Sequence, residues 1–206
     1  MTGTLPRDWR TLDRVTTLYV AYNGLSGTLP PEWGEMSLSW LIFDSNHFAG
    51  TLPPEWGQMP VEKLQMISNQ LEGTLPTQYA AWSNITLLQL SENQLTGPLP
   101  SQWGGLTLLG ALEFAQNYLV GTIPSEWRQL VRLTSLKGDS NLLTGTLPSE
   151  WTAFTTIGVL SLSNNSFNGS LPSEWVVLTS LIEINLGNNE LSGTIPNEWR
   201  AFAGAI

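Results

Sequence analysis

The chain has 206 residues, a formal net charge of −9 and no cysteine. The absence of cysteine excludes disulfides, thiolate metal sites and cysteine nucleophiles, and a single histidine is too few for a usual zinc site. The acidic balance disfavours nucleic acid as a partner, because nucleic-acid binding requires clustered Lys and Arg, and no apolar run approaches the length of a membrane span.

One phrase, GTLPxEW with close variants, recurs along the whole chain at intervals of 23 or 24 residues. A fixed period in this range predicts a solenoid, in which each repeat is one coil stacked on the next. No linker interrupts the period, so we expect a single array over residues 1–206, with eight strand-bearing repeats and partial repeats at both ends. The nine copies begin at Gly3, Gly27, Gly50, Gly73, Gly97, Gly121, Gly145, Gly169 and Gly193.

Each repeat begins with two apolar residues that stand nine and seven positions before the motif glycine. This alternation predicts a short strand with one buried face, and stacking of the coils should align the strands into a parallel, concave sheet of about eight strands. The sixth repeat departs from the pattern. The pairs are Leu18/Val20, Leu41/Phe43, Leu64/Met66, Leu88/Leu90, Leu112/Phe114, Leu136/Gly138, Leu160/Leu162 and Ile184/Leu186.

An asparagine follows each predicted strand, four residues before the motif glycine, without exception in eight repeats. A buried Asn amide offers two donors and an acceptor to backbone groups that each bend leaves unpaired. We therefore interpret the column as structural and not as a polar binding stripe. Its members are Asn23, Asn46, Asn69, Asn93, Asn117, Asn141, Asn165 and Asn189.

The motif itself predicts a tight bend at Gly and a short 3-10 segment that Pro begins. An acidic residue near the start of this segment suits the backbone dipole, and the Trp closes the coil by turning inward. Tyr79 replaces the Trp in one copy, and Trp82 occupies an apolar slot nearby. We interpret all of these rings as core and not as a ligand-stacking ladder. The motif tryptophans are Trp9, Trp33, Trp56, Trp103, Trp127, Trp151, Trp175 and Trp199.

Trp40 has no place in the repeat pattern. It precedes Leu41 in a predicted strand, so alternation places Trp40 and Ile42 on the concave face, beside Tyr19 and Tyr22 of the neighbouring coil. Exposed clustered aromatics are typical binding anchors. Two alternatives remain open, namely contact with a preceding repeat and no role at all. The candidate binding residues on this face are Tyr19, Tyr22, Trp40, Ile42, Lys63, Gln65, Gln89 and Glu113.

No catalytic constellation emerges from the remaining polar residues. Asp44, Ser45 and His47 lie close together in sequence, but a triad also needs a buried orienting group and an oxyanion hole, which nothing suggests. Glu92 and Glu113 fall on adjacent coils without a closed pocket that would perturb their pKa values. We expect a non-enzyme with no cofactor and no metal. Asn84, Asn164 and Asn168 begin glycosylation sequons, which matter only in a secretory compartment.

The complete pattern, LxxLxLxxNxLxGxLPxxW, resembles the leucine-rich repeat family over the whole chain. The LxGxLP portion resembles the plant-specific class, and the terminal Trp, as in residues 27–33, resembles the repeats of trypanosomatid surface antigens. The resemblance implies a right-handed leucine-rich-repeat solenoid at the cell surface or outside the cell. Those antigens also carry a signal peptide, cysteine-containing flanks and a membrane anchor, so we expect the chain to be a fragment of a longer array.

We therefore expect a non-catalytic recognition module, part of a cell-surface antigen or receptor, that binds a protein, peptide or glycan on its concave face. The alternative is a structural surface coat or spacer with no defined ligand. Both ends of the array begin or end a coil without a polar cap, which predicts self-association or fraying. The exposed end residues would be Leu5, Trp9, Trp199, Phe202 and Ile206.

Overall fold

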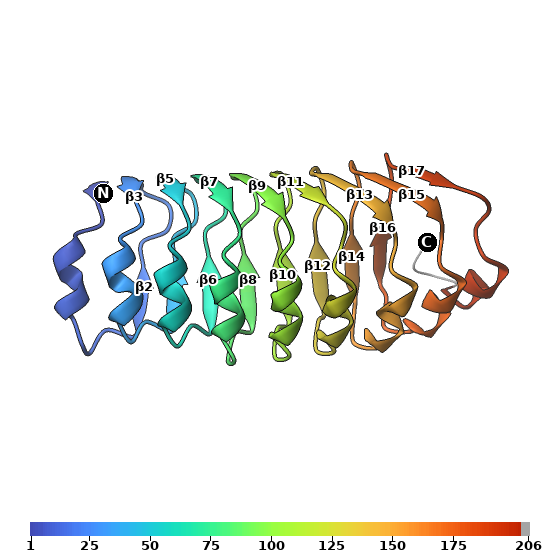
Figure 1. Ribbon diagram of the computed structural model, residues 1–206, viewed down its shortest axis with the longest axis horizontal. Coiled ribbons are helices and arrows are strands. Elements are labelled where there is room, and N and C mark those ends of the chain that lie inside the picture. Colours follow the sequence, from blue (N-terminus) through green and yellow to red (C-terminus); the bar gives the residue numbers. More distant parts are fainter. Residues whose placement is uncertain (203–206) are drawn as a thin grey trace.

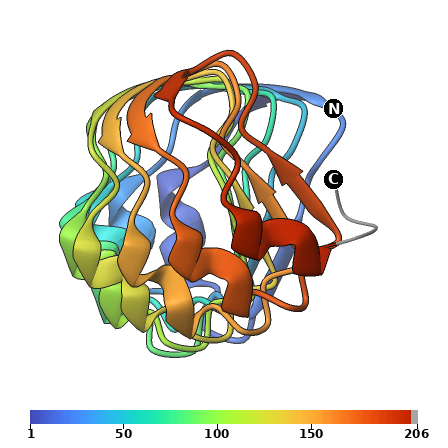
Figure 2. The same cartoon turned by 90° about the vertical axis from the view of Figure 1, so that its right-hand side faces the viewer.

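The computed structural model describes residues 1–202. The chain forms an open leucine-rich-repeat solenoid, in which each coil stacks directly on the preceding one along the long axis (Figure 1). Viewed along that axis, the coils superpose as rings with two strand-bearing walls and a third wall of short helices (Figure 2). This arrangement confirms the predicted fold class.

The first wall is an eight-stranded parallel sheet whose strands follow the sequence order of the repeats. The central residue of each strand points inward, and from the second to the seventh strand that residue is fully buried. The outward side of this sheet is called the eight-stranded face below. The strands are β2 (Thr17–Tyr19), β4 (Trp40–Ile42), β6 (Lys63–Gln65), β8 (Leu87–Gln89), β10 (Ala111–Glu113), β12 (Ser135–Lys137), β14 (Val159–Ser161) and β16 (Glu183–Asn185).

A second, nine-stranded parallel sheet occupies the part of each repeat where the sequence predicts only a bend. The bend lies inside the strand, because the motif glycine takes a positive φ, as at Gly27 with φ 82°. A Cβ at Gly27 would also lie 2.8 Å from Cγ2 of Thr4 in the preceding coil. The strands are β1 (Thr2–Thr4), β3 (Gly24–Thr28), β5 (His47–Thr51), β7 (Gln70–Thr74), β9 (Gln94–Pro98), β11 (Tyr118–Gly121), β13 (Leu142–Thr146), β15 (Ser166–Ser170) and β17 (Glu190–Ser192).

Short 3-10 helices form the third wall, and in η1 to η8 a motif proline directly precedes the first helical residue. None of the helices in residues 1–202 is long and apolar enough to cross a membrane. The helices are η1 (Arg7–Thr11), η2 (Pro31–Glu35), η3 (Pro54–Gln58), η4 (Thr77–Ala81), η5 (Ser101–Gly105), η6 (Ser125–Gln129), η7 (Ser149–Ala153), η8 (Ser173–Val177) and η9 (Asn197–Phe202).

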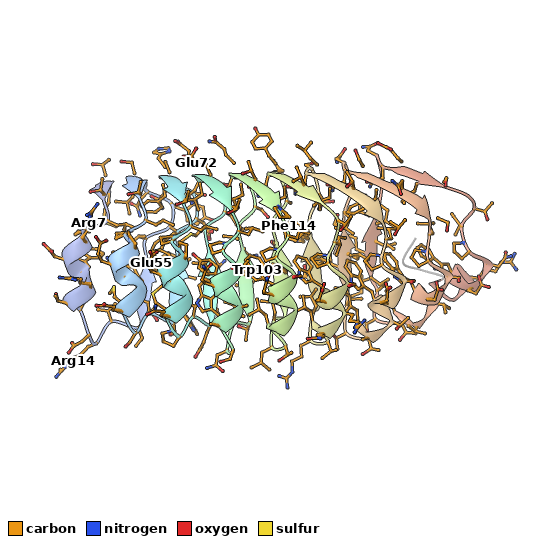
Figure 3. All side chains as sticks on the ribbon, viewed as in Figure 1. Arg7, Arg14, Glu55, Glu72, Trp103 and Phe114 are labelled. Atoms are coloured by element: carbon orange, nitrogen blue, oxygen red, sulfur yellow. The ribbon has the colours of Figure 1, made fainter. Side chains whose placement is uncertain are left out.

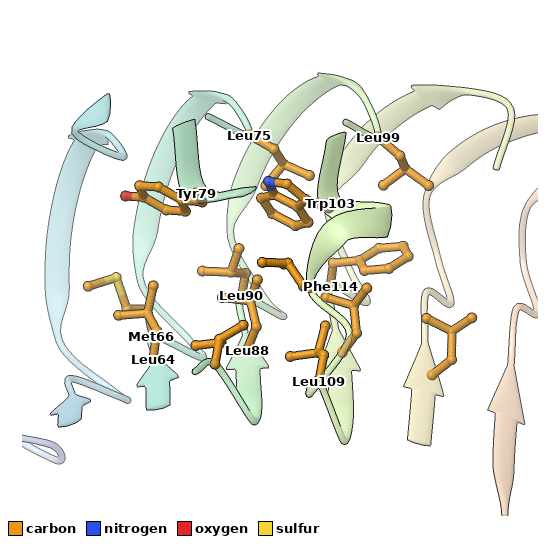
Figure 4. Close-up of a cluster of buried hydrophobic side chains, with 14 of the residues drawn as sticks. Leu64, Met66, Leu75, Tyr79, Leu88, Leu90, Leu99, Trp103, Leu109 and Phe114 are labelled. Carbon is orange, nitrogen blue, oxygen red and sulfur yellow. The ribbon is translucent and has the colours of Figure 1, made fainter. Parts of the chain in front are cut away.

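The motif tryptophans from Trp33 to Trp199 are buried in the core, as Figures 3 and 4 show for Trp103, and Trp9 is partly buried. The rings of Trp33 and Trp56 stack almost parallel, with centroids 6.2 Å apart. The Trp56 indole N–H donates to the carbonyl of Pro30 in the preceding coil at 2.8 Å. The same bond recurs for Trp33, Trp103, Trp127, Trp175 and Trp199, so these residues both fill the interior and tie their coil to the preceding one; the buried indole N–H of Trp151 has no such partner among the described residues.

The ladder of tryptophans is interrupted at Tyr79, and Trp82 compensates. The two rings stack with centroids 3.8 Å apart, and the Trp82 indole N–H donates to the carbonyl of Trp56 at 2.9 Å. The bond to the preceding coil is therefore kept although the motif position has lost its indole. Tyr79 itself is fully buried, and its hydroxyl has no hydrogen-bond partner among the described residues.

Tyr79→Phe should therefore raise the free energy of unfolding by about 1 kcal/mol, because it removes a buried polar group that makes no hydrogen bond. Burial also raises the pKa of the Tyr79 hydroxyl well above 10, so no charge is lost at neutral pH. Urea denaturation of the two chains measures the difference. A Tyr79→Phe chain that is less stable than the wild type would show that the hydroxyl has a stabilising partner.

A steric constraint explains why the sixth repeat has Gly138 where the other repeats have a larger apolar residue. A Cβ at Gly138 would lie 2.5 Å from Cε2 of Phe114, whose ring fills the space that an aliphatic residue occupies in other coils. Phe114 also packs edge-on against Trp127 at 6.0 Å. The large side chain of Phe114 in one coil is thus accommodated by the missing side chain of Gly138 in the next coil.

Candidate functional site

The eight-stranded face is the surface that the sequence predicts for binding, and its strands hold each outward side chain on a packed base. Beneath it, Leu41, Phe43 and Leu64 are fully buried. The strands pair in register, so Trp40 lies between Thr17 and Lys63 on its neighbours. Side chains at equivalent positions therefore form rows that cross the coils at the spacing of paired strands.

Trp40 is 39% exposed and is held by the following coil. Its indole N–H donates to Oε2 of Glu62 at 3.0 Å, and Nζ of Lys63 lies 4.1 Å from the ring centroid. The preceding coil presents only the short side chain of Thr17 in register. The indole is thus ordered from one side and open toward the coil that carries Tyr19 and Tyr22.

Tyr19 and Tyr22 are 66% and 75% exposed and lie on the coil before Trp40. Tyr22 has a φ of 57°, a conformation that all eight repeats adopt at this position. Asn164 and Asn188 occupy it in the last two repeats, and Asn tolerates positive φ far better than a bulky side chain does. Serine, glutamate and glutamine adopt it in the other repeats, so the conformation admits many side chains and the exposure of Tyr22 is what marks it as a candidate anchor.

Ile42 corrects the sequence-based interpretation. It lies on the eight-stranded face as predicted, but it is only 7% exposed. It stands in register between Tyr19 and Gln65, whose longer side chains flank it on both sides. Alternation gave its direction, but exposure depends on the neighbours across the sheet. Ile42 supports the aromatic residues and is not itself an accessible anchor.

Asp44 is a site residue that the sequence reasoning missed. It continues the outward row of Trp40 and Ile42, yet it is only 8% exposed. Its Oδ1 accepts the backbone N–H of Ile67 at 2.8 Å. Burial raises the pKa of the Asp44 carboxyl, and the hydrogen bond from Ile67 opposes that rise. Alternation from Trp40 would have identified this carboxylate as a neighbour of the aromatic residues.

The three residues that suggest a catalytic triad are not arranged as one. Asp44 binds the next coil, Ser45 takes a φ of 53°, and exposed His47 begins β5 in the other sheet. Across residues 1–202, no group of three or more His, Cys, Asp or Glu is placed to hold a metal ion. The described residues therefore contain neither this triad nor a metal site.

A chain of polar contacts crosses the middle of the eight-stranded face. Gln65 Nε2 donates to Gln89 Oε1 at 2.7 Å, and Gln89 Nε2 donates to Glu113 Oε2 at 2.9 Å. Glu113 Oε1 then lies 3.3 Å from Nζ of Lys137. Glu92 is not paired with Glu113, because its carboxylate accepts the hydroxyl of Ser68. The structure brings the predicted residues Gln65, Gln89 and Glu113 together as one ordered strip.

A second exposed apolar cluster lies on the nine-stranded sheet. Tyr118, Val120 and Leu142 are 57%, 40% and 55% exposed, and Val120 stands in register with Leu142. The sequence reasoning missed this cluster because it predicted no strand here and so could not assign these side chains to a face. The signal was the occurrence of apolar residues in outward slots of consecutive repeats.

The last described coil leaves its interior open. A hollow of about 360 Å³ is lined mainly by apolar side chains, among them Leu171, Ile184 and Leu191, with Trp199 at its edge. At the first coil Leu5 is buried and Trp9 is partly buried. Of the predicted end residues, Ile206 lies outside the described residues.

Four segments of the chain match the family model described as Leucine Rich Repeat, at residues 14–36, 84–106, 157–178 and 180–202. No curated protein matches the chain. Among solved structures, a TDR receptor is 32% identical with a TM-score of 0.95, over 99% of this chain and 36% of that chain.

Two receptor ectodomains from Arabidopsis are similar as well. The GASSHO1/SCHENGEN3 ectodomain in complex with CASPARIAN STRIP INTEGRITY FACTOR 2 is 29% identical, with a TM-score of 0.88 over 97% of this chain and 27% of that chain. The HAESA ectodomain in complex with an IDA peptide hormone ligand is 28% identical, with a TM-score of 0.82 over 99% and 38%. The chain spans 27–38% of the length of these three structures.

Proposed function

We propose that this leucine-rich-repeat solenoid is a non-catalytic recognition module that binds an extended peptide on its eight-stranded face. The observation that carries the proposal is the N-terminal aromatic cluster of Tyr19, Tyr22 and Trp40, exposed on a packed sheet. Exposed aromatic side chains with an ordered base are the usual anchors of protein interfaces. The peptide-bound HAESA ectodomain, similar over 99% of this chain, supports the choice of a peptide.

The geometry of the face also favours an extended ligand. Its outward residues form rows that cross the strands, and the strip from Gln65 to Lys137 spans four coils. An extended peptide that crosses the strands would meet the aromatic cluster first and the polar strip after it. A folded protein or a glycan remains a second class of ligand for the same surface.

We place the module at the cell surface or outside the cell, as part of a receptor or an antigen. The similarity to receptor ectodomains supports this location, and the sequon residues Asn84, Asn164 and Asn168 are exposed. The comparisons do not support the resemblance to trypanosomatid antigens, which rests on the tryptophan-ended motif alone. The alternative function is a coat or spacer without a ligand. In that case the open end coils would be the surfaces through which the array stacks.

Trp40→Ala should weaken peptide binding by about tenfold or more, because it removes the central ring of the cluster. Since Trp40 is partly exposed and holds only Glu62 and Lys63, the free energy of unfolding should fall by only about 1 kcal/mol. Peptides selected from a random display library on the immobilised 206-residue chain provide the ligands, and titration calorimetry measures their affinity.

Tyr118→Ala is the matched control, because it removes an exposed aromatic ring from the other sheet. It should leave affinity within about twofold. If Tyr118→Ala abolishes binding and Trp40→Ala does not, the proposed face is wrong. If neither the peptide library nor a glycan array yields a ligand, the spacer function is correct and the recognition module is not.

A further inference from the structure

Asp44 is a largely buried residue whose carboxylate keeps one oxygen open to solvent and has no cationic partner among residues 1–202. It is 8% exposed, and buried charges in proteins are normally paired. One carboxylate oxygen accepts the Ile67 N–H, and the other makes no hydrogen bond with the described residues. The ion pairs among residues 1–202 join Arg7 to Glu32 and Lys137 to Glu113, so neither neutralises Asp44.

The aromatic cluster lies on the same face as this carboxylate, in its own coil and in the preceding one. Trp40 and Ile42 precede Asp44 in its own outward row, and the Tyr22 backbone N–H donates to the Asp44 carbonyl at 2.8 Å. The faces of Trp and Tyr rings attract cations. Trp40 already holds one ammonium group, because Lys63 lies over its ring. A carboxylate next to several aromatic rings is a favourable environment for a positively charged side chain.

The rest of the eight-stranded face also favours a positively charged ligand group over a negatively charged one. Both lysines on it are engaged, Lys63 with Trp40 and Lys137 with Glu113. An anionic ligand group would find no free cation there, whereas a basic ligand would be attracted by the excess of carboxylates. The acidic residues on or beside the face are Asp44, Glu62, Glu92, Glu113, Asp139 and Glu183.

From this arrangement we infer that the N-terminal end of the face accepts a Lys or Arg side chain of the bound peptide. The ammonium or guanidinium group pairs with Asp44 beside Tyr19 and Tyr22 of the preceding coil, and the neighbouring part of the peptide contacts Trp40 further along the same row. The inference rests on the proposed peptide-binding function and names the chemical class of its ligand. It assigns Asp44 the role of charge partner, which the repeat pattern does not require.

The substitution Asp44→Asn tests this role without disturbing the fold. An Asn side chain keeps an oxygen for the Ile67 N–H and removes the buried charge. The folded-state pKa of Asp44 is raised above its unfolded value of 3.8. The destabilising cost of its charge therefore grows as pH rises through the raised pKa and the folded chain loses the proton. Asp44→Asn should consequently be at least as stable as the wild type at pH 7.

A matched control exists in the same chain. Asp139 occupies the equivalent position four coils away, and its Oδ1 accepts the backbone N–H of Ser163 at 2.9 Å. Asp139→Asn changes the net charge by the same amount and keeps an oxygen for this N–H and for the hydroxyls of Ser161 and Ser163, which also donate to Asp139. No exposed aromatic cluster like that of Tyr19, Tyr22 and Trp40 lies beside it among residues 1–202.

The experiment uses peptides selected on the wild-type chain, each synthesised with Arg and with the uncharged analogue citrulline at the basic position. We expect the selected peptides to share a Lys or Arg. Citrulline should weaken binding to the wild type by about tenfold or more, and Asp44→Asn should weaken the Arg peptide equally. Asp44→Asn should change the affinity of the citrulline peptide by less than about twofold, because the pair is already broken.

Three results would overturn the inference. Peptides that need Trp40 but contain no basic residue, and that bind Asp44→Asn normally, would leave the proposed function intact and refute the cation site. An equal loss with Asp139→Asn would indicate general charge attraction and not a site at Asp44. A library that yields no peptide at all would refute both the inference and the function on which it rests.

Discussion

Replacing Trp127 by alanine should lower the free energy of unfolding by about 3–5 kcal/mol, because it opens a large cavity in the core. Trp127 is fully buried, packs edge-on against Phe114, and donates its indole N–H to the carbonyl of Pro100 at 2.9 Å. The substitution removes this volume and leaves that carbonyl without its partner. Both losses fall at the contact between two neighbouring coils.

The effect of Trp127→Ala should be regional, because each coil contacts only its neighbours. Hydrogen exchange should show the greatest loss of protection in the coils on either side of Trp127, and urea denaturation gives the total. Trp40→Ala is the matched control, since it truncates the same residue type at a partly exposed position and should cost about 1 kcal/mol. Equal losses in the two chains would mean that burial in the motif column does not determine stability.

The sequence predicts the structure of one coil well, because each position of the repeat has nearly the same neighbours in every coil. A residue that recurs at one position in eight coils must satisfy the same local environment each time. Position alone therefore indicates that Trp33 and Trp103 are inside and that a strand precedes each Asn. Position does not predict the residue type where one coil fills space in the next, as Phe114 does beside Gly138. The repeat pattern describes each position by itself and not the contacts between coils.

The candidate site is less predictable for the same reason. Its residues break the repeat, so only strand alternation locates them, and alternation gives direction without exposure. Ile42 is covered by its neighbours, and Trp40 is oriented by Glu62 and Lys63, which lie in the next coil. The Asp44 carboxylate accepts the backbone N–H of Ile67, 23 positions later in the sequence. These are contacts across the sheet that one coil's sequence does not contain.

The repeat pattern also did not predict the nine-stranded sheet. A positive φ at every motif glycine suggests a bend, and the chain does bend there. Strand pairing between neighbouring coils nevertheless continues through the bend, since the motif Gly itself pairs in register with a residue of the following coil, as Gly27 does with Phe48. Missing this sheet meant that the exposed cluster of Tyr118, Val120 and Leu142 was not recognised.

Asn117→Ala should lower the free energy of unfolding by about 2–3 kcal/mol, since several buried backbone groups lose their partner at once. The Asn117 amide donates to the carbonyls of Leu90, Phe114 and Ala115 at 3.0, 3.1 and 3.2 Å. Its oxygen accepts the Leu95 N–H at 2.9 Å. One side chain thus satisfies backbone groups of two coils, and alanine supplies none of these bonds.

Two further substitutions separate the hydrogen bonds of Asn117 from its volume. Asn117→Asp has nearly the same shape but places a carboxylate against three carbonyl oxygens, so at neutral pH it should be at least as destabilising as alanine. Its stability should recover in part below the pKa of the new carboxyl group, because the protonated acid again has a hydrogen to donate. Asn84→Ala, at an exposed position without a side-chain hydrogen bond to the described residues, should change stability by less than about 0.5 kcal/mol. Urea denaturation as a function of pH measures all three chains, and an Asn117→Asp chain as stable as the wild type at pH 7 would contradict a donor role for the amide.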